Sequence, residues 1–249
     1  ELKIIEEELK KNAERELNEI YNPELYFTGD ASSPKFNANL LAENIRSLIP
    51  FVTLADTDET YWFDRNEGIW KPNGEAKIKS LVREILGEFA TTHYVNETVA
   101  AVKQTTYIDR NKFDSLPLEE IPVANGILNW KTKELRPYKP EDYVTQKLPV
   151  IYDPNVKAEN FNKFLHEILA NEEDVQVVKE MFAYCLYRDY PLQKAFMLVG
   201  DGSNGKSTLL QVLAAFLGKE NISSVALQDL SKNRFAPAQL YRKLAKTKF

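Results

Sequence analysis

The residues with the clearest chemical meaning are the nine from Gly200 to Thr208, which read Gly-Asp-Gly-Ser-Asn-Gly-Lys-Ser-Thr. They fit the P-loop pattern G-x-x-x-x-G-K-[S/T]. Glycines let such a loop curl until successive backbone N–H groups point at phosphate oxygens. The N-terminus of a following helix would add a partial positive charge. The pattern therefore predicts a binding site for the phosphates of a nucleotide.

The loop residues have different predicted roles. Lys206, the candidate catalytic residue, would reach the β- and γ-phosphates, and the Ser207 hydroxyl would ligate Mg²⁺. ATP and Mg²⁺ are therefore the expected cofactors. The candidate cofactor-binding residues are Gly200, Gly202, Ser203, Asn204, Gly205, Lys206, Ser207 and Thr208.

Nucleotide hydrolysis needs groups that the loop does not supply. They are an acidic residue at the end of another strand, a residue that orients water and a positive group for the transition state. Downstream, Val225–Asp229 could be a strand ending in an acid, but a turn or cap role is favoured for Asp229. About 50 residues follow the expected P-loop strand at 196–199, too few for the usual parallel sheet. We therefore expect the P-loop domain to be incomplete here, and turnover by this chain alone stays open.

Two other groups of residues could do chemistry, but a structural role is favoured for both. Asp56 and Asp58 have metal-ligand spacing, yet they lie in a polar turn. Aromatic residues with basic neighbours could stack on bases and contact phosphates, although packing of the rings and solvation of the charges is favoured. These residues are Tyr61, Trp62, Arg65, Trp70, Lys71, Trp130, Lys131 and Lys133.

Composition limits the class of protein. The chain has 249 residues and is 43% hydrophobic, which is enough for a sizeable core. Its single cysteine, Cys185, excludes an internal disulfide and a zinc cluster, and fits a reducing, cytoplasmic setting. No apolar stretch approaches the roughly 18 residues of a membrane helix, so no membrane partner is expected.

The charge of the chain is unevenly distributed. The net charge is −5, but residues 231–249 contain basic side chains and no acidic ones. This basic end could face nucleic acid or nucleotide. Alternatively, acidic segments outside this chain could balance it, and the sequence does not decide between the two. The basic residues are Lys232, Arg234, Arg242, Lys243, Lys246 and Lys248.

Hydrophobic periodicity and turn signals predict the elements that would position these residues. Helices are expected at 1–20, 40–48, 76–89, 97–103, 158–169, 172–187 and 207–217, and strands or hairpins at 51–54, 60–63, 69–71, 127–130, 134–136 and 196–199. Residues 144–150 could be extended.

The predicted fold class is an α+β N-terminal domain with hairpins and helices, then a helical segment leading into a truncated α/β P-loop (AAA+) domain. The expected divisions are 1–39 (helix and linker), 40–153 (mixed α/β domain), 154–192 (helical segment) and 193–249 (start of the P-loop domain).

The run from Asn125 to Thr208 resembles the phage and plasmid primase–helicase family, which includes the poxvirus primase–helicase. Its motor is a superfamily-three AAA+ helicase. The residues that carry the resemblance are 125–128, 147–154, 161–169, 193–196 and the P-loop with Asn before Gly-Lys-Ser, followed by 217–218, 229–230, 233–235 and 240–244.

The resemblance implies a replicative DNA helicase or primase–helicase of a plasmid or virus. Residues 40–150 would form the domain before the motor, and 155–192 the segment that helps form a ring collar. The full protein would bind single-stranded or forked DNA and assemble as a homo-oligomeric ring. The family's acidic strand, polar sensor and arginine finger are expected beyond Phe249. Two alternatives stay open: another P-loop NTPase or kinase, and a non-enzymatic DNA-binding or assembly module.

Overall fold

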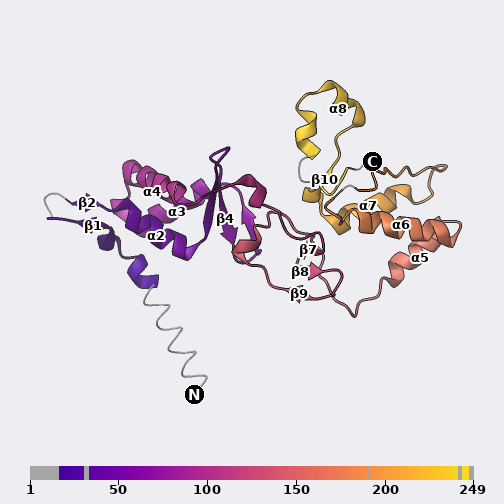
Figure 1. Ribbon diagram of the computed structural model, residues 1–249, viewed down its shortest axis with the longest axis horizontal. Helices are drawn as coiled ribbons and strands as arrows, with labels where there is room; N and C mark the ends of the chain where they lie inside the picture. Colours follow the sequence, from indigo (N-terminus) through magenta and orange to yellow (C-terminus); the bar gives the residue numbers. More distant parts are fainter. Residues whose placement is uncertain (1–16, 31–33, 190, 241–242, 247–249) are drawn as a thin grey trace, which may run out of the picture. The chain divides into compact units, whose positions relative to one another are not determined.

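The computed structural model describes residues 17–30, 34–189, 191–240 and 243–246. The chain forms two compact units, 1–115 and 116–249 (Figure 1), and each is described by itself. Of the helix expected over 1–20, residues 17–20 are helical and the remainder lies outside the described residues. The division at Ser115 falls inside the range 40–153, which the sequence had suggested as one domain.

Unit 1 combines a four-stranded sheet with three main helices. The sheet has the order β5-β4-β3-β6, in which β3 pairs antiparallel with β4 and parallel with β6. The bounds are η1 Pro23–Tyr26, β1 Phe27–Thr28, β2 Lys35–Phe36, α2 Ala38–Leu48, β3 Phe51–Leu54, β4 Thr60–Asp64, β5 Ile69–Lys71, α3 Gly74–Leu86, η2 Gly87–Phe89, α4 Thr92–Gln104, β6 Tyr107–Ile108 and η3 Arg110–Lys112. The predicted hairpin strands and the helices at 40–48 and 76–89 are thus confirmed, with small shifts at their ends.

The helices of unit 1 bury their apolar faces in one core. Ile45 of α2, Ile78 of α3 and Val102 of α4 are all fully buried, and they share this core with Phe51 of β3. On the same face of the sheet, the Thr53 hydroxyl lies 3.2 Å from that of Thr60 and 2.9 Å from that of Thr106. Buried polar atoms need such partners, so the hydroxyl cluster allows the polar side chain of Thr53 to be buried in β3.

The start of α3 depends on close approach of two backbones. Asn73, the N-cap, is left-handed with φ of 62°, a conformation that asparagine tolerates better than most residues. A Cβ atom on the next residue, Gly74, would lie 2.8 Å from the carbonyl oxygen of Thr60 in β4. The predicted Asn73-Gly74 turn therefore also brings α3 against the sheet.

Unit 2 contains a three-stranded antiparallel sheet, β7-β8-β9, and a group of helices. The bounds are β7 Glu120–Val123, β8 Gly126–Asn129, β9 Leu135–Arg136, η4 Pro140–Asp142, α5 Glu159–Ile168, α6 Glu172–Tyr184, α7 Lys206–Leu217, η5 Lys219–Asn221, β10 Ile222–Ser223, α8 Leu227–Lys232, η6 Ala236–Leu240 and β11 Ala245–Lys246. Leu165 of α5, Val175 of α6 and Leu209 of α7 meet in its core together with Val123 of β7. The predicted hairpin at 127–136 and the helices at 158–169, 172–187 and 207–217 are confirmed.

Two strand expectations for unit 2 are wrong. Residues 196–199 form no strand, and Met197 and Val199 are 86% and 83% exposed; no described segment supplies the hydrogen-bonding neighbour that a strand requires. Residues 144–150, where an extended segment was expected, contain neither helix nor strand. Val225–Asp229 is not a strand either, since α8 begins at Leu227 and places Asp229 in its first turn. An acidic residue there is favourable for the helix dipole.

Among the described residues, every helix is too short or too polar to cross a bilayer.

Replacing Gly74 with alanine tests the packing of α3 on β4. The new methyl group would clash with the Thr60 carbonyl, so Gly74→Ala should lower the free energy of unfolding by about 1–3 kcal/mol. Urea denaturation followed by circular dichroism measures the change. Ser80→Ala, at an exposed position of the same helix, is the matched control and should be neutral or slightly stabilising. Equal stabilities for the two variants would contradict the packing.

Candidate nucleotide-binding site

The P-loop residues form a tight turn that ends at the first residue of α7. Ser203 and Gly205 both have left-handed backbones, with φ of 60° and 82°. Gly205 is the N-cap of α7, and Lys206 and Ser207 are its first two residues. A turn of this kind directs backbone N–H groups to one side, where an anion is stabilised.

The Lys206 ammonium group lies within the loop. Its Nζ donates to the carbonyl oxygens of Gly200 (2.7 Å) and Asp201 (3.0 Å) and to Oδ1 of Asn204 (2.6 Å). The side chain of Lys206, the candidate catalytic residue, therefore folds back onto the turn that contains the left-handed residues Ser203 and Gly205. Asn204 also lies close to Gly200, where an added Cβ would meet the Asn204 amide nitrogen.

The loop is held in place by helix α5. A Cβ on Gly205 would lie 2.6 Å from Cγ2 of Ile168, the last residue of α5. Beyond the loop, Leu209, Leu213 and Leu217 anchor α7 in the core of unit 2. Ile168 could not be identified from the sequence alone, because nothing in a single sequence connects it with a glycine 37 positions later.

A side-chain contact between His166 and Glu172 links the end of α5 to the start of α6. His166 Nε2 lies 2.9 Å from a carboxylate oxygen of Glu172, and Nδ1 lies 2.7 Å from the backbone oxygen of Asn162. Both contacts, that with Asn162 first, raise the pKa of His166. The pair is exposed, so it adds little stability, but it restrains the turn that follows Ile168.

The predicted Mg²⁺ ligand Ser207 and its neighbour Thr208 are both exposed on the first turn of α7. No described group of three or more His, Cys, Asp or Glu side chains could hold a metal by itself. Asp229 lies on helix α8 and not at a strand end, so its geometry differs from that expected of a metal-site acid.

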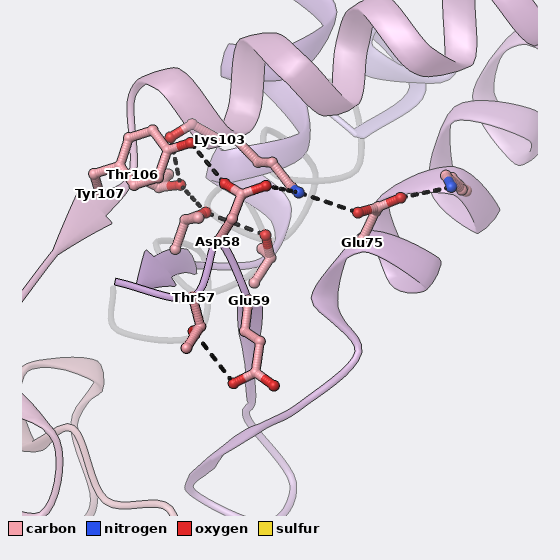
Figure 2. A network of polar contacts seen from close by, with 10 residues as sticks. Thr57, Asp58, Glu59, Glu75, Lys103, Thr106 and Tyr107 are labelled. Atoms are coloured by element: carbon pink, nitrogen blue, oxygen red, sulfur yellow. Dashed lines mark hydrogen bonds and ion pairs between the residues drawn. The ribbon is translucent and has the colours of Figure 1, made fainter. Parts of the chain in front are cut away.

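Asp56 and Asp58 are occupied by ion pairs and do not form a carboxylate pair for a metal. Arg110 binds Asp56 through two nitrogens, at 2.6 and 3.2 Å. Figure 2 shows Asp58 between Lys103 (2.8 Å) and the Tyr107 hydroxyl (2.7 Å), while Lys103 also reaches Glu75 at 3.1 Å. The contacts of Asp56 and Asp58 therefore support a structural role for this turn and not metal binding.

The aromatic residues near basic side chains are mostly packing residues. Trp70 is 3% exposed, and the Tyr61 ring packs against Phe113 with centroids 4.9 Å apart. Lys71 lies near the Trp62 ring but pairs with Asp64 at 2.7 Å. On the second hairpin, Lys131 pairs with Glu119 and Trp130 donates to the Leu118 carbonyl oxygen. In each hairpin, the lysine that lies near the tryptophan ring is therefore paired with a carboxylate.

Two glycine variants test the geometry of the loop. Gly205→Ala should lower the free energy of unfolding of unit 2 by about 2 kcal/mol or more, because it strains a left-handed backbone and collides with Ile168. Gly202→Ala is the control, since open space surrounds that position, and it should stay within about 0.5 kcal/mol. Chemical denaturation compares them. A Gly205→Ala variant as stable as Gly202→Ala would refute the contact.

The turn at Asp58 can be tested by titration. Hydrogen bonds from Lys103, and then from Tyr107, hold the pKa of Asp58 below its ordinary value of 3.8. The stabilisation is therefore present above pH 3.8 and is lost as the pH falls through the lowered pKa. NMR titration of the carboxyl carbon should show that Lys103→Met raises this pKa. Lys79→Met, which removes the other partner of Glu75, should change it much less; equal changes would contradict the assignment.

Residues 52–170 match the family model described as D5 N terminal like. No curated protein matches the chain. The matched range covers just under half of the chain, begins in β3 and ends just after α5, before the P-loop. It supports, at a coarse level, the resemblance to the N-terminal region of phage and viral primase–helicase proteins of the D5 type.

Proposed function

We propose that the chain binds a nucleoside triphosphate with Mg²⁺ through residues 200–208, as part of a primase–helicase-like DNA replication protein. The observation that carries the proposal is the turn at Ser203–Gly205, which joins two left-handed residues to the start of α7 and to the Lys206 ammonium. These are the elements with which a P-loop binds phosphate.

Binding would exchange weak contacts of Lys206 for stronger ones. Its present partners are two neutral carbonyl oxygens and a neutral amide oxygen. A phosphate oxygen carries negative charge, and hydrogen bonds between charged partners are roughly twice as strong as neutral ones. The ammonium can therefore turn from the loop to the β- and γ-phosphates with a net gain.

Ser207 would hold the metal ion beside the phosphates. Mg²⁺ held there would supply positive charge for phosphoryl transfer. The exposed Ser207 hydroxyl supplies one oxygen ligand at the helix start, while Thr208 lies beside it on the same turn. Leu209, buried behind them, fixes the direction of this turn.

The replication role rests on the match of residues 52–170. A primase–helicase acts on DNA, so single-stranded or forked DNA is the proposed partner. An AAA+ motor, assembly as a homo-oligomeric ring and ATP-driven unwinding are further parts of the proposal for the full protein. They are supported by the resemblance in residues 125–208.

Substitution of the loop lysine tests nucleotide binding. Lys206→Ala removes the one cation in the loop and should weaken binding of a fluorescent ATP analogue, with Mg²⁺, by at least tenfold (about 1.4 kcal/mol). Lys219→Ala, at the other end of α7, should bind as the native chain does. Fluorescence anisotropy gives both dissociation constants. Native-like binding by Lys206→Ala, or no binding by the native chain, would contradict the proposal.

A further inference from the structure

The basic segment that follows α8 presents an exposed aromatic ring. The Phe235 side chain is 69% exposed, against 38% for Trp130 and 45% for Phe196. The backbone at this ring is held by hydrogen bonds. The Phe235 N–H donates to Oδ1 of Asn233, and the Ala236 N–H donates to the Asn233 carbonyl oxygen, both at 2.9 Å. Ala236, next to the ring, is buried. The backbone therefore fixes the turn while the ring stays in solvent.

Two cations accompany this ring. The guanidinium carbon of Arg234 lies 4.8 Å from the Phe235 ring centroid, a stacking distance. Lys232 precedes it at the end of α8. Neither Lys232 nor Arg234 forms an ion pair with any residue in the described ranges. The one acidic residue between 227 and 240 is Asp229, so this stretch has a net positive charge.

The contrast with the two hairpins is informative. There, Lys71 and Lys131 also lie near tryptophan rings, but carboxylates of Asp64 and Glu119 neutralise them. Beside Phe235 both the ring and the charges are open. An exposed aromatic ring stacks on a nucleic-acid base of any type, and neighbouring cations contact the phosphates. A single strand of nucleic acid offers both a base for the ring and phosphates for the cations.

We infer that Lys232–Phe235 is a contact site for single-stranded nucleic acid. A base stacks on the open face of Phe235, the Arg234 guanidinium covers the ring and faces a phosphate, and Lys232 contacts the next phosphate. This deepens the proposed function, because it assigns the DNA contact to particular residues and rests on DNA being the partner.

Stacking and charge can be separated by salt dependence. A fluorescently labelled oligothymidylate is titrated with the native chain at several salt concentrations. Phe235→Ala should raise the dissociation constant at least about fivefold, with the slope of log K against log salt unchanged. Arg234→Gln and Lys232→Gln should each reduce that slope by about 0.7, the value for one phosphate contact on a single strand. Phe235→Tyr should keep the native affinity.

Two controls keep the test decisive. Trp130→Ala removes another exposed aromatic side chain next to a lysine in unit 2 and should leave the affinity unchanged. Phe235→Trp, which keeps a stacking ring if alanine is not tolerated, should bind like the native chain and lose fluorescence when the oligonucleotide is added. Thermal denaturation confirms that each variant is folded.

The outcomes distinguish the inference from the proposal on which it rests. If the native chain binds the oligonucleotide but Phe235→Ala leaves the affinity unchanged, or the fluorescence of Phe235→Trp does not change when the oligonucleotide is added, the inference is overturned and the DNA partner stands. If Phe235→Ala changes sedimentation but not DNA binding, the ring contacts another copy of the chain, and the inference is again overturned. If the native chain binds no oligonucleotide at any salt concentration, the DNA partner itself is contradicted.

Discussion

The contact between Gly205 and Ile168 constrains the turn that leads from residues 200–205 into α7. The backbone of Gly205 approaches the Ile168 side chain so closely that no Cβ fits between them, and its left-handed φ of 82° starts α7 in the required direction. Helix α7 then enters the same core as Leu165 and Val175. Helices α5 and α6 are therefore the support of the loop, and a change in their packing would move Lys206 and Ser207.

Much of the fold could be predicted from the sequence where local patterns decide it. Strands β3, β4 and β5 are short runs rich in β-forming residues with clear turns between them, and α3 has an unbroken apolar stripe. Helix α7 follows from the same reasoning, since Gly218 ends it. The candidate loop was equally accessible, because its residues are contiguous and their chemistry depends on spacing along the chain.

What could not be predicted depends on partners distant in sequence. The apolar run 196–199 suggested a strand, but a strand requires a hydrogen-bonded neighbour, and none of the described segments pairs with it. Ile168 gave no signal because its role arises only when α5 packs beside Gly205. Conversely, Asp56 and Asp58 have the spacing of metal ligands, yet Arg110 and Lys103 turn them into ion-paired residues (Figure 2). Spacing identifies a possible ligand, and the surrounding charges decide whether it can act as one.

The central claim is that nucleotide phosphates bind at the turn before α7, and backbone NMR tests it most directly. Adding ATP and Mg²⁺ to the isotope-labelled chain should shift the amide signals of residues 200–208, with the largest changes at Gly205, Lys206 and Ser207, where the helix begins. Smaller shifts should reach Ile168 through its contact with Gly205. Unchanged signals at 200–208, or shifts confined to other parts of the chain, would contradict the account.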